Sequence, residues 1–307
     1  MFRFSLISAV VLVGALHRTP VRQPIRRRTT HPLHFGRREA LGGTVAAISA
    51  GCACCSLSPQ PACALAALVR DEKLERSYEI PRDLNRDAGF ARGMATGMQS
   101  YESAVRPTKL RLFENFRRAL PPSDAVIVEL GMGSFPNAPF YTDTADLARL
   151  QRLDIIGVDP NDSMSSFATR NAKRYNLDGE HGHSVRCVHG IGEALPFAAG
   201  SVDAVVSTLT LCSVPNVERS LAEVRRVLKP GGQFLFLEHV LSETDEGLAA
   251  TQRLLTPMQV AQADGCHLDR QTLRSIRAAG FGKVDAEYFE LKGFLYLNPT
   301  VAGIATI

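Results

Sequence analysis

Apolar residues occur in separate blocks along this chain. The spacing of apolar residues within each block predicts whether it forms a strand or a helix. Short apolar runs have the length and β-branched composition of buried strands. They cover residues 126–130, 155–158, 204–211 and 233–240. Residues 217–228 instead place Val217, Leu221, Val224 and Leu228 on one helical stripe. Buried strands that alternate with helices predict an α/β fold around a parallel sheet.

The segment before the first strand has a helical period. Apolar residues recur at steps of four, four, three and four between Phe90 and Val105, which marks one face of a helix. Residues 71–120 are therefore predicted to be helical, with an interruption at Pro107. We expect these helices to pack on the sheet. The alternative is a lid over the site, with Tyr101 facing it.

After the core, the pattern predicts one more helix and a hairpin. Residues 270–279 have a helical pattern, and residues 283–290 and 300–307 read as strands of a terminal antiparallel hairpin. The stretch 242–263 carries no recognisable chemistry, and we expect it to supply acceptor selectivity.

Two predicted strands end in groups suited to a nucleoside. The first ends in Gly131-Met-Gly133, where the absence of Cβ atoms lets backbone amides approach a ligand. The second ends at Asp159, whose carboxylate can accept hydrogen bonds from both hydroxyls of a ribose. Because Pro160 suits a first helical turn, the alternative role of Asp159 is a helix N-cap. These features predict a nucleoside-containing cofactor across the carboxyl edge of the sheet.

The glycine turn lacks the residues that mark dinucleotide and nucleoside triphosphate sites, and this narrows the choice of cofactor. A dinucleotide fingerprint has a third glycine where this chain has Pro136. No Gly-Lys-Ser/Thr follows, so a Walker loop is also excluded. The remaining common cofactor of this type is S-adenosylmethionine.

Several short sequence motifs resemble those of the class I S-adenosylmethionine-dependent methyltransferases. They are, in order, Glu129-Leu-Gly-Met-Gly133, Gly192-Glu-Ala-Leu-Pro-Phe197, Ser201-Val-Asp203 and Leu228-Lys-Pro-Gly-Gly232. Within the class, residues 158–161, 208–214, 237–240 and 264–266 resemble the methyltransferase-like seven branch. Animal members of that branch methylate small thiols, and plants and algae have plastid relatives. The resemblance covers roughly residues 121–307. It implies a doubly wound, seven-stranded Rossmann-like sheet with a terminal antiparallel hairpin, here preceded by a helical extension.

The same resemblance implies the cofactor contacts. They are Glu129, Gly131, Gly133, Asn137, Asp159, Pro160, Gly192, Glu193, Thr208 and Leu209. Glu129 is expected near the cofactor's ammonium, Glu193 near adenine and Thr208 near the methyl group. Two positions depart from the family pattern. Phe135 replaces a glycine of the first motif, and Ile191 replaces an Asp that binds adenine in many relatives.

Catalysis of methyl transfer needs alignment more than acid–base chemistry. A thiol acceptor is partly ionised at neutral pH, so a base is optional, whereas an oxygen or carbon acceptor requires one more often. His239 is the candidate catalytic residue and His267 the second choice, although a histidine at a strand end is more often structural. Cys212 and Cys266 are expected to be small apolar wall residues.

The distribution of charge and of cysteines limits the classes of molecule that this chain is expected to bind. The formal charge of +4 comes from residues 1–66, which hold eight arginines and one glutamate, so the rest of the chain is net negative. We therefore expect a small-molecule substrate and no nucleic acid, and leave peripheral membrane association and oligomeric state open. Cys187, Cys212 and Cys266 lie far apart in the sequence without metal-motif spacing, so no metal site is predicted.

The first 66 residues resemble targeting sequences. An apolar run at 4–16 precedes an arginine-rich, acid-free stretch, and Arg37-Arg38 precedes another apolar run and Ala62-Cys-Ala64. This order of signal, transit and twin-arginine features predicts a plastid, with the thylakoid lumen as a further step and a mitochondrion as the alternative. The chain thus divides into a targeting region (1–66), a helical extension (67–120) and a main domain (121–307).

The sequence favours a methyltransferase that uses S-adenosylmethionine on a thiol, or on a quinone-, phenol- or lipid-like metabolite. The alternatives are a catalytically inactive binding protein with this fold and, with less support, a nicotinamide oxidoreductase.

Overall fold

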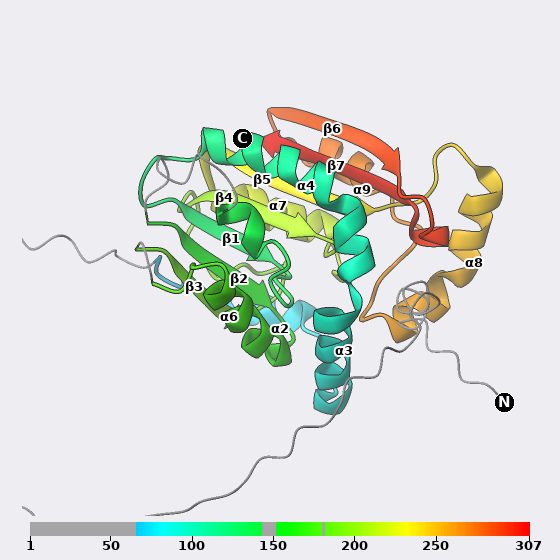
Figure 1. Cartoon of the computed structure of the whole chain (residues 1–307), viewed down its shortest axis with the longest axis horizontal. Helices are drawn as coiled ribbons and strands as arrows, with labels where there is room; N and C mark the ends of the chain where they lie inside the picture. Colours follow the sequence, from blue (N-terminus) through cyan, green and yellow to red (C-terminus); the bar gives the residue numbers. More distant parts are fainter. Residues whose placement is uncertain (1–65, 143–151, 180–181) are drawn as a thin grey trace, which may run out of the picture. The chain divides into compact units, whose positions relative to one another are not determined.

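A seven-stranded sheet organises the described part of the chain, which in this computed structural model comprises residues 66–142, 152–179 and 182–307 (Figure 1). Its order is β3-β2-β1-β4-β5-β7-β6. The strands are β1 (Val126–Leu130), β2 (Asp154–Asp159), β3 (Ser184–His189), β4 (Val202–Thr208), β5 (Leu228–His239), β6 (Lys283–Glu290) and β7 (Pro299–Thr306). The first five strands pair in parallel, and β7 is antiparallel to both β5 and β6. The predicted doubly wound sheet with its terminal antiparallel hairpin is confirmed.

Helices cover both faces of the sheet. They are α2 (Glu72–Tyr78), α3 (Leu84–Gly97), α4 (Gln99–Ala119), α5 (Ala138–Thr142), α6 (Ser165–Arg174), α7 (Val217–Val227), α8 (Glu246–Gln262) and α9 (Thr272–Ala278), with short 3₁₀ turns η2 (Asp162–Met164) and η3 (Leu295–Leu297). Successive strand residues point to opposite faces. Ile127 accordingly packs in a cluster with α4, α5 and α6, whereas Val128 packs in a second cluster with α7 and α9.

The helical extension is confirmed, but its break lies elsewhere than predicted. α3 ends at Gly97, and Met98 separates it from α4 with φ −90° and ψ 1°. Pro107 lies inside α4 and does not interrupt it. The buried face of α4, from Tyr101 to Phe116, continues across the proline. Packing of this face stabilises the helix enough to offset the missing backbone hydrogen bond at Pro107.

The fourth strand is shorter than the predicted run 204–211. β4 ends at Thr208 because Leu209 turns the chain with φ 56°. The next two amides, of Thr210 and Leu211, then donate to the Glu238 carboxylate, each at 3.1 Å. A side chain therefore satisfies backbone donors that a longer strand would have paired within the sheet.

Residues 1–65 lie outside the described part, so the targeting signals stay a sequence prediction. Among the residues that are described, we find no helix with the length and apolar character needed to cross a bilayer.

Candidate functional site

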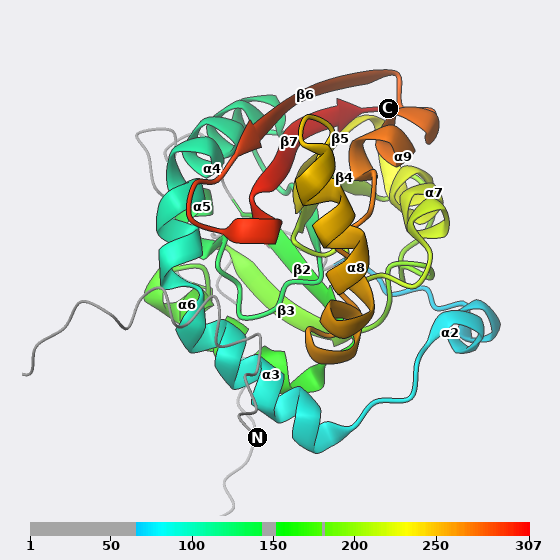
Figure 2. The same ribbon diagram turned by 90° about the vertical axis from the view of Figure 1, so that its right-hand side faces the viewer.

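A cavity of about 450 Å³ opens at the carboxyl edge of the parallel strands. In Figure 2, α3 and α8 lie around this edge. Eight of the predicted cofactor residues line the cavity, namely Gly131, Gly133, Asp159, Pro160, Gly192, Glu193, Thr208 and Leu209. They come from the ends of β1, β2 and β4 and from the loop after β3, because parallel strands bring their carboxyl ends to one edge. Glu129, Asn137 and His239 are not among the lining residues.

The two glycines of the first turn have different reasons to be glycine. Both have positive φ, 60° at Gly131 and 56° at Gly133. A Cβ on Gly131 would lie 2.4 Å from Oγ1 of Thr210, so close packing excludes a side chain there. A Cβ on Gly133 would meet only the Gly131 carbonyl oxygen, at 3.9 Å. Gly133 therefore keeps open a part of the cavity wall that a ligand can occupy.

Phe135 occupies a left-handed position in the turn. It adopts φ 61°, a conformation that favours glycine, and its side chain is fully buried. Its ring lies 5.9 Å from that of Tyr141, so aromatic packing in the core helps to hold the strained backbone. A non-glycine residue thus holds a left-handed backbone conformation at this position.

Asp159 links the two strand ends. Its Oδ2 accepts a hydrogen bond from Gly133 N at 2.9 Å, and its Oδ1 accepts one from Asn161 N at 2.8 Å. Burial raises its pKa to about 6, although both backbone donors act in the opposite direction. Asn161, and not Asp159, caps the following 3₁₀ turn. Each carboxylate oxygen keeps a free lone pair for a ligand hydroxyl in the cavity.

Glu129 lies behind the cavity wall. Its Oε1 accepts from the Tyr141 hydroxyl at 2.7 Å, and its Oε2 accepts from Asn137 Nδ2 at 3.1 Å. Burial raises its pKa to about 7, and these two hydrogen bonds oppose the shift. Asn137 also donates to Thr208 Oγ1 at 3.1 Å and so connects β1 to the end of β4. Contact between Glu129 and a cofactor ammonium stays a prediction.

The loop after β3 presents Glu193 to the cavity. One carboxylate oxygen of Glu193 accepts from Asn216 N at 2.7 Å, and the other is buried without a partner. Burial also raises the pKa of Glu193. Next to it, a Cβ on Gly192 would lie 2.9 Å from Ser220 Oγ, so a larger residue would disturb the packing on α7. An unpaired buried acceptor that belongs to a cavity-lining residue fits a ligand with a donor group.

The helical extension contributes polar groups that the sequence did not single out. Arg82 donates to Asp87 in α3 at 2.8 Å and to Asp264, beyond α8, at 2.9 Å, and all three line the cavity. Lys109 is 1% exposed and donates to Glu102 at 2.8 Å, again within the lining. Helices before the sheet therefore form one side of the cavity, and their closure as a lid stays a prediction.

Tyr101, which the lid alternative placed toward the site, is not a lining residue. It is buried, and its ring packs edge-to-face on Phe294 at 5.6 Å. The buried hydroxyl of Tyr101 has no hydrogen-bond partner.

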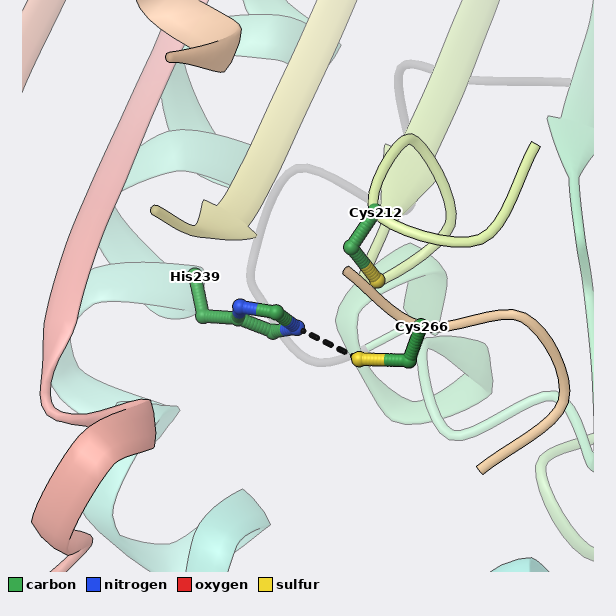
Figure 3. A group of neighbouring side chains, drawn as sticks. All are labelled: Cys212, His239 and Cys266. Carbon is green, nitrogen blue, oxygen red and sulfur yellow. Dashed lines mark hydrogen bonds between the residues drawn. The ribbon is translucent and has the colours of Figure 1, made fainter. Parts of the chain in front are cut away.

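Cys212, His239 and Cys266 form a buried cluster beside the cavity (Figure 3). His239 Nε2 lies 3.0 Å from Cys266 Sγ. The hydrogen bond between Cys212 and Cys266 lowers the pKa of Cys266. The same hydrogen bond and burial raise the pKa of Cys212. Cys212 and Cys266 are far apart in the sequence but are neighbours in the fold, because the loops after β4 and α8 meet at the end of β5. His267, the second candidate base, is half-exposed and lies 3.7 Å from Asp269.

Comparison with known proteins adds evolutionary evidence to this geometry. Residues 129–236 match the family described as "Methyltransferase domain". Thiol S-methyltransferase TMT1A of Homo sapiens is 33% identical over 192 residues, which cover 62% of this chain and 74% of the relative. Thiol S-methyltransferase TMT1B of Rattus norvegicus is 34% identical over 197 residues, with coverages of 64% and 76%.

More distant similarity reaches other methyltransferases. Ubiquinone/menaquinone biosynthesis C-methyltransferase UbiE of Methylobacterium nodulans is 29% identical over 174 residues, covering 55% of this chain and 61% of the relative. Among solved structures, one chain belongs to the complex between the Haloferax volcanii Trm112 methyltransferase activator and the putative methyltransferase. It has a TM-score of 0.52 at 19% identity and covers 74% of this chain and 99% of its own length. This structural match supports the fold alone.

Proposed function

Because the chain belongs to the family of S-adenosylmethionine-dependent methyltransferases that includes the thiol S-methyltransferases TMT1A and TMT1B, we propose that it methylates the sulfur of a small thiol. The protein is a class I methyltransferase, so the nicotinamide oxidoreductase alternative is set aside. The observation that carries the proposal is the cavity itself, whose lining combines nucleoside-binding groups with an apolar wall.

The residues at the strand ends fit S-adenosylmethionine. Asp159 would hold the ribose hydroxyls, and the open space at Gly133 would admit part of the cofactor that a Cβ would displace. The unpaired oxygen of Glu193 would accept a hydrogen bond on the adenine side. Lys109, a buried lysine that pairs with Glu102, would hold the carboxylate of the methionine moiety. When bound, the cofactor supplies an electrophilic methyl group on a positively charged sulfur.

The remaining wall suits an apolar acceptor. Phe90, Met94, Met98, Leu209 and Val260 line this part of the cavity. Such a wall excludes water, and a thiolate that meets a sulfonium loses charge in the transition state, so desolvation favours the reaction. A thiol with a pKa near 8.5 is already a few per cent ionised at neutral pH. Alignment by the wall and exclusion of water are therefore the main contributions of these residues.

A dedicated base is not required for this acceptor. His239 is 4% exposed, and its Nε2 faces Cys266 and not the cavity. A general-base role for His239 stays a prediction that applies to an oxygen or carbon acceptor, for which proton removal must accompany methyl transfer.

The acceptor class can be tested with a matched pair, thiophenol and phenol, which differ only in the reacting atom. The full chain with S-adenosylmethionine is expected to convert thiophenol to methyl phenyl sulfide, detected by mass spectrometry, with no comparable methylation of phenol. Methylation of phenol at an equal or higher rate would contradict the thiol proposal and favour a phenol- or quinol-type acceptor.

A further inference from the structure

Three soft or borderline ligand atoms converge at one point of the fold. Cys212 follows β4, His239 ends β5 and Cys266 follows α8, so three separate segments bring them together (Figure 3). Their side chains are buried, with 2%, 4% and 7% of the residue exposed. The two sulfur atoms and an imidazole nitrogen all lie within 4.8 Å of one another.

This donor set matches the preferences of thiophilic cations. Thiolate and imidazole suit Zn²⁺ and related ions, whereas Mg²⁺ and Ca²⁺ prefer oxygen. Bond lengths of about 2.3 Å to sulfur and about 2.0 Å to nitrogen require ligand atoms about 3.6–3.8 Å apart in a tetrahedron. The His239 Nε2–Cys266 Sγ distance of 3.0 Å is shorter than this, and all three ligand atoms lie within 4.8 Å of one another, so side-chain adjustments of about 1 Å or less would bring them to this spacing. Gln259 Nε2 lies 3.5 Å from Cys266 Sγ and supports that ligand from behind.

The number of protein ligands leaves one coordination position of this cluster open. Structural zinc sites have four protein ligands, whereas sites that bind a reactant have three and an open position. The described part of the chain offers three ligands in this cluster. Ser213 and Gly265, the neighbours of the two cysteines, line the cavity. The cluster thus adjoins the cavity at Ser213 and Gly265.

We propose that Cys212, His239 and Cys266 bind a thiophilic divalent cation, represented by Zn²⁺, whose fourth position takes the acceptor thiol. This inference rests on the proposed function. The thiol releases its proton to solvent as its sulfur binds the cation. The thiolate sulfur then forms a bond to the methyl carbon, and the carbon–sulfonium bond breaks with its electron pair retained by the cofactor sulfur. The resulting thioether is a weaker ligand and leaves.

Cobalt can test the site without any enzymatic reaction. The full chain, reduced and stripped with a chelator, is titrated with Co²⁺, and thiolate-to-cobalt charge-transfer absorption is recorded. One equivalent is expected to give this band, and Cys212→Ser, Cys266→Ser and His239→Gln are each expected to weaken it severalfold or abolish it. Cys187→Ser is the matched control, because it removes a cysteine outside the cluster, and the band should persist. Circular dichroism checks that each variant is folded.

Two results would overturn the site. One is no band in the unmodified protein, and the other is an undiminished band in Cys212→Ser, which would place the metal on other cysteines such as those before residue 66. Thiophenol is then added to the cobalt protein, where a shifted band is expected and phenol should cause none. An unshifted band in a protein that still methylates thiophenol would overturn the substrate-binding role. A shifted band without methylation would contradict the proposed function and leave the site standing.

Discussion

Asp159→Asn is the substitution that most sharply tests how the cavity holds its cofactor. The aspartate carboxylate accepts hydrogen bonds from Gly133 N and Asn161 N and lines the cavity. Asparagine keeps the shape but removes the charge, and its amide nitrogen cannot accept. Loss of one hydrogen bond to a charged group removes roughly 1.5–3 kcal/mol, so the Kd for S-adenosylmethionine should rise about ten- to a hundredfold.

The pH dependence separates this role from a merely structural one. Burial raises the pKa of Asp159 to about 6, and ribose hydroxyls favour the ionised form. Affinity in the unmodified protein should therefore be full above pH 6 and fall as the pH drops through this value, approaching about tenfold per pH unit. Asp159→Asn should lack this component.

Isothermal titration at several pH values measures both effects. Asp162→Asn is the matched control, since Asp162 lies on the same connection but is exposed and outside the cavity lining. Equal affinities of the Asp159→Asn variant and the unmodified protein at pH 7.5, with the same pH profile, would refute the assignment of Asp159 to the ribose.

Four further predictions concern Glu129, the two glycines of the first turn, Arg82 and the targeting region. Burial raises the pKa of Glu129 to about 7, so the contribution of this group to the free energy of unfolding should fall by up to about 3 kcal/mol as pH rises from 4.5 to 7. Chemical denaturation of Glu129→Gln should lack this component of the pH slope, and an unchanged slope would contradict the prediction. Gly133→Ala should remain folded but lose calorimetric affinity for S-adenosylmethionine, whereas Gly131→Ala should lower the melting temperature because its Cβ meets Thr210; equal behaviour would show that the open space is not used. Arg82→Ala removes the link between Asp87 and Asp264, so the rate of cofactor release measured by stopped flow should rise severalfold. An unchanged release rate would show that the extension does not close the cavity. A fluorescent protein fused after residue 66 should enter plastids in algal cells, and mitochondrial fluorescence would contradict that location.

The sequence predicted which strand ends meet at the cavity, because parallel strands place their carboxyl ends at one edge. Gly131, Asp159 and Thr208 each follow a short apolar run, and parallel strands bring such ends together whatever the rest of the fold does. Phe135 shows the limit of motif reasoning. Its residue type does not predict the left-handed backbone that it adopts in a buried aromatic environment.

Features that depend on long-range packing could not be read from local patterns. Lys109 is polar and lies on a helix otherwise judged by its apolar face, so nothing in the sequence marks it as a cavity residue. Cys212 and Cys266 are separated by two helices and a strand, and only the meeting of their loops at the end of β5 makes them neighbours. Spacing along the chain therefore does not indicate that these two cysteines are neighbours.

Calorimetric titration of the full chain with S-adenosylmethionine, with NADH as the control ligand, tests the central claim most directly. The cavity at the carboxyl edge predicts saturable binding of S-adenosylmethionine with micromolar affinity and no binding of NADH. A folded protein that binds neither ligand, or binds NADH in preference, would contradict the assignment of this cavity to the methyl donor.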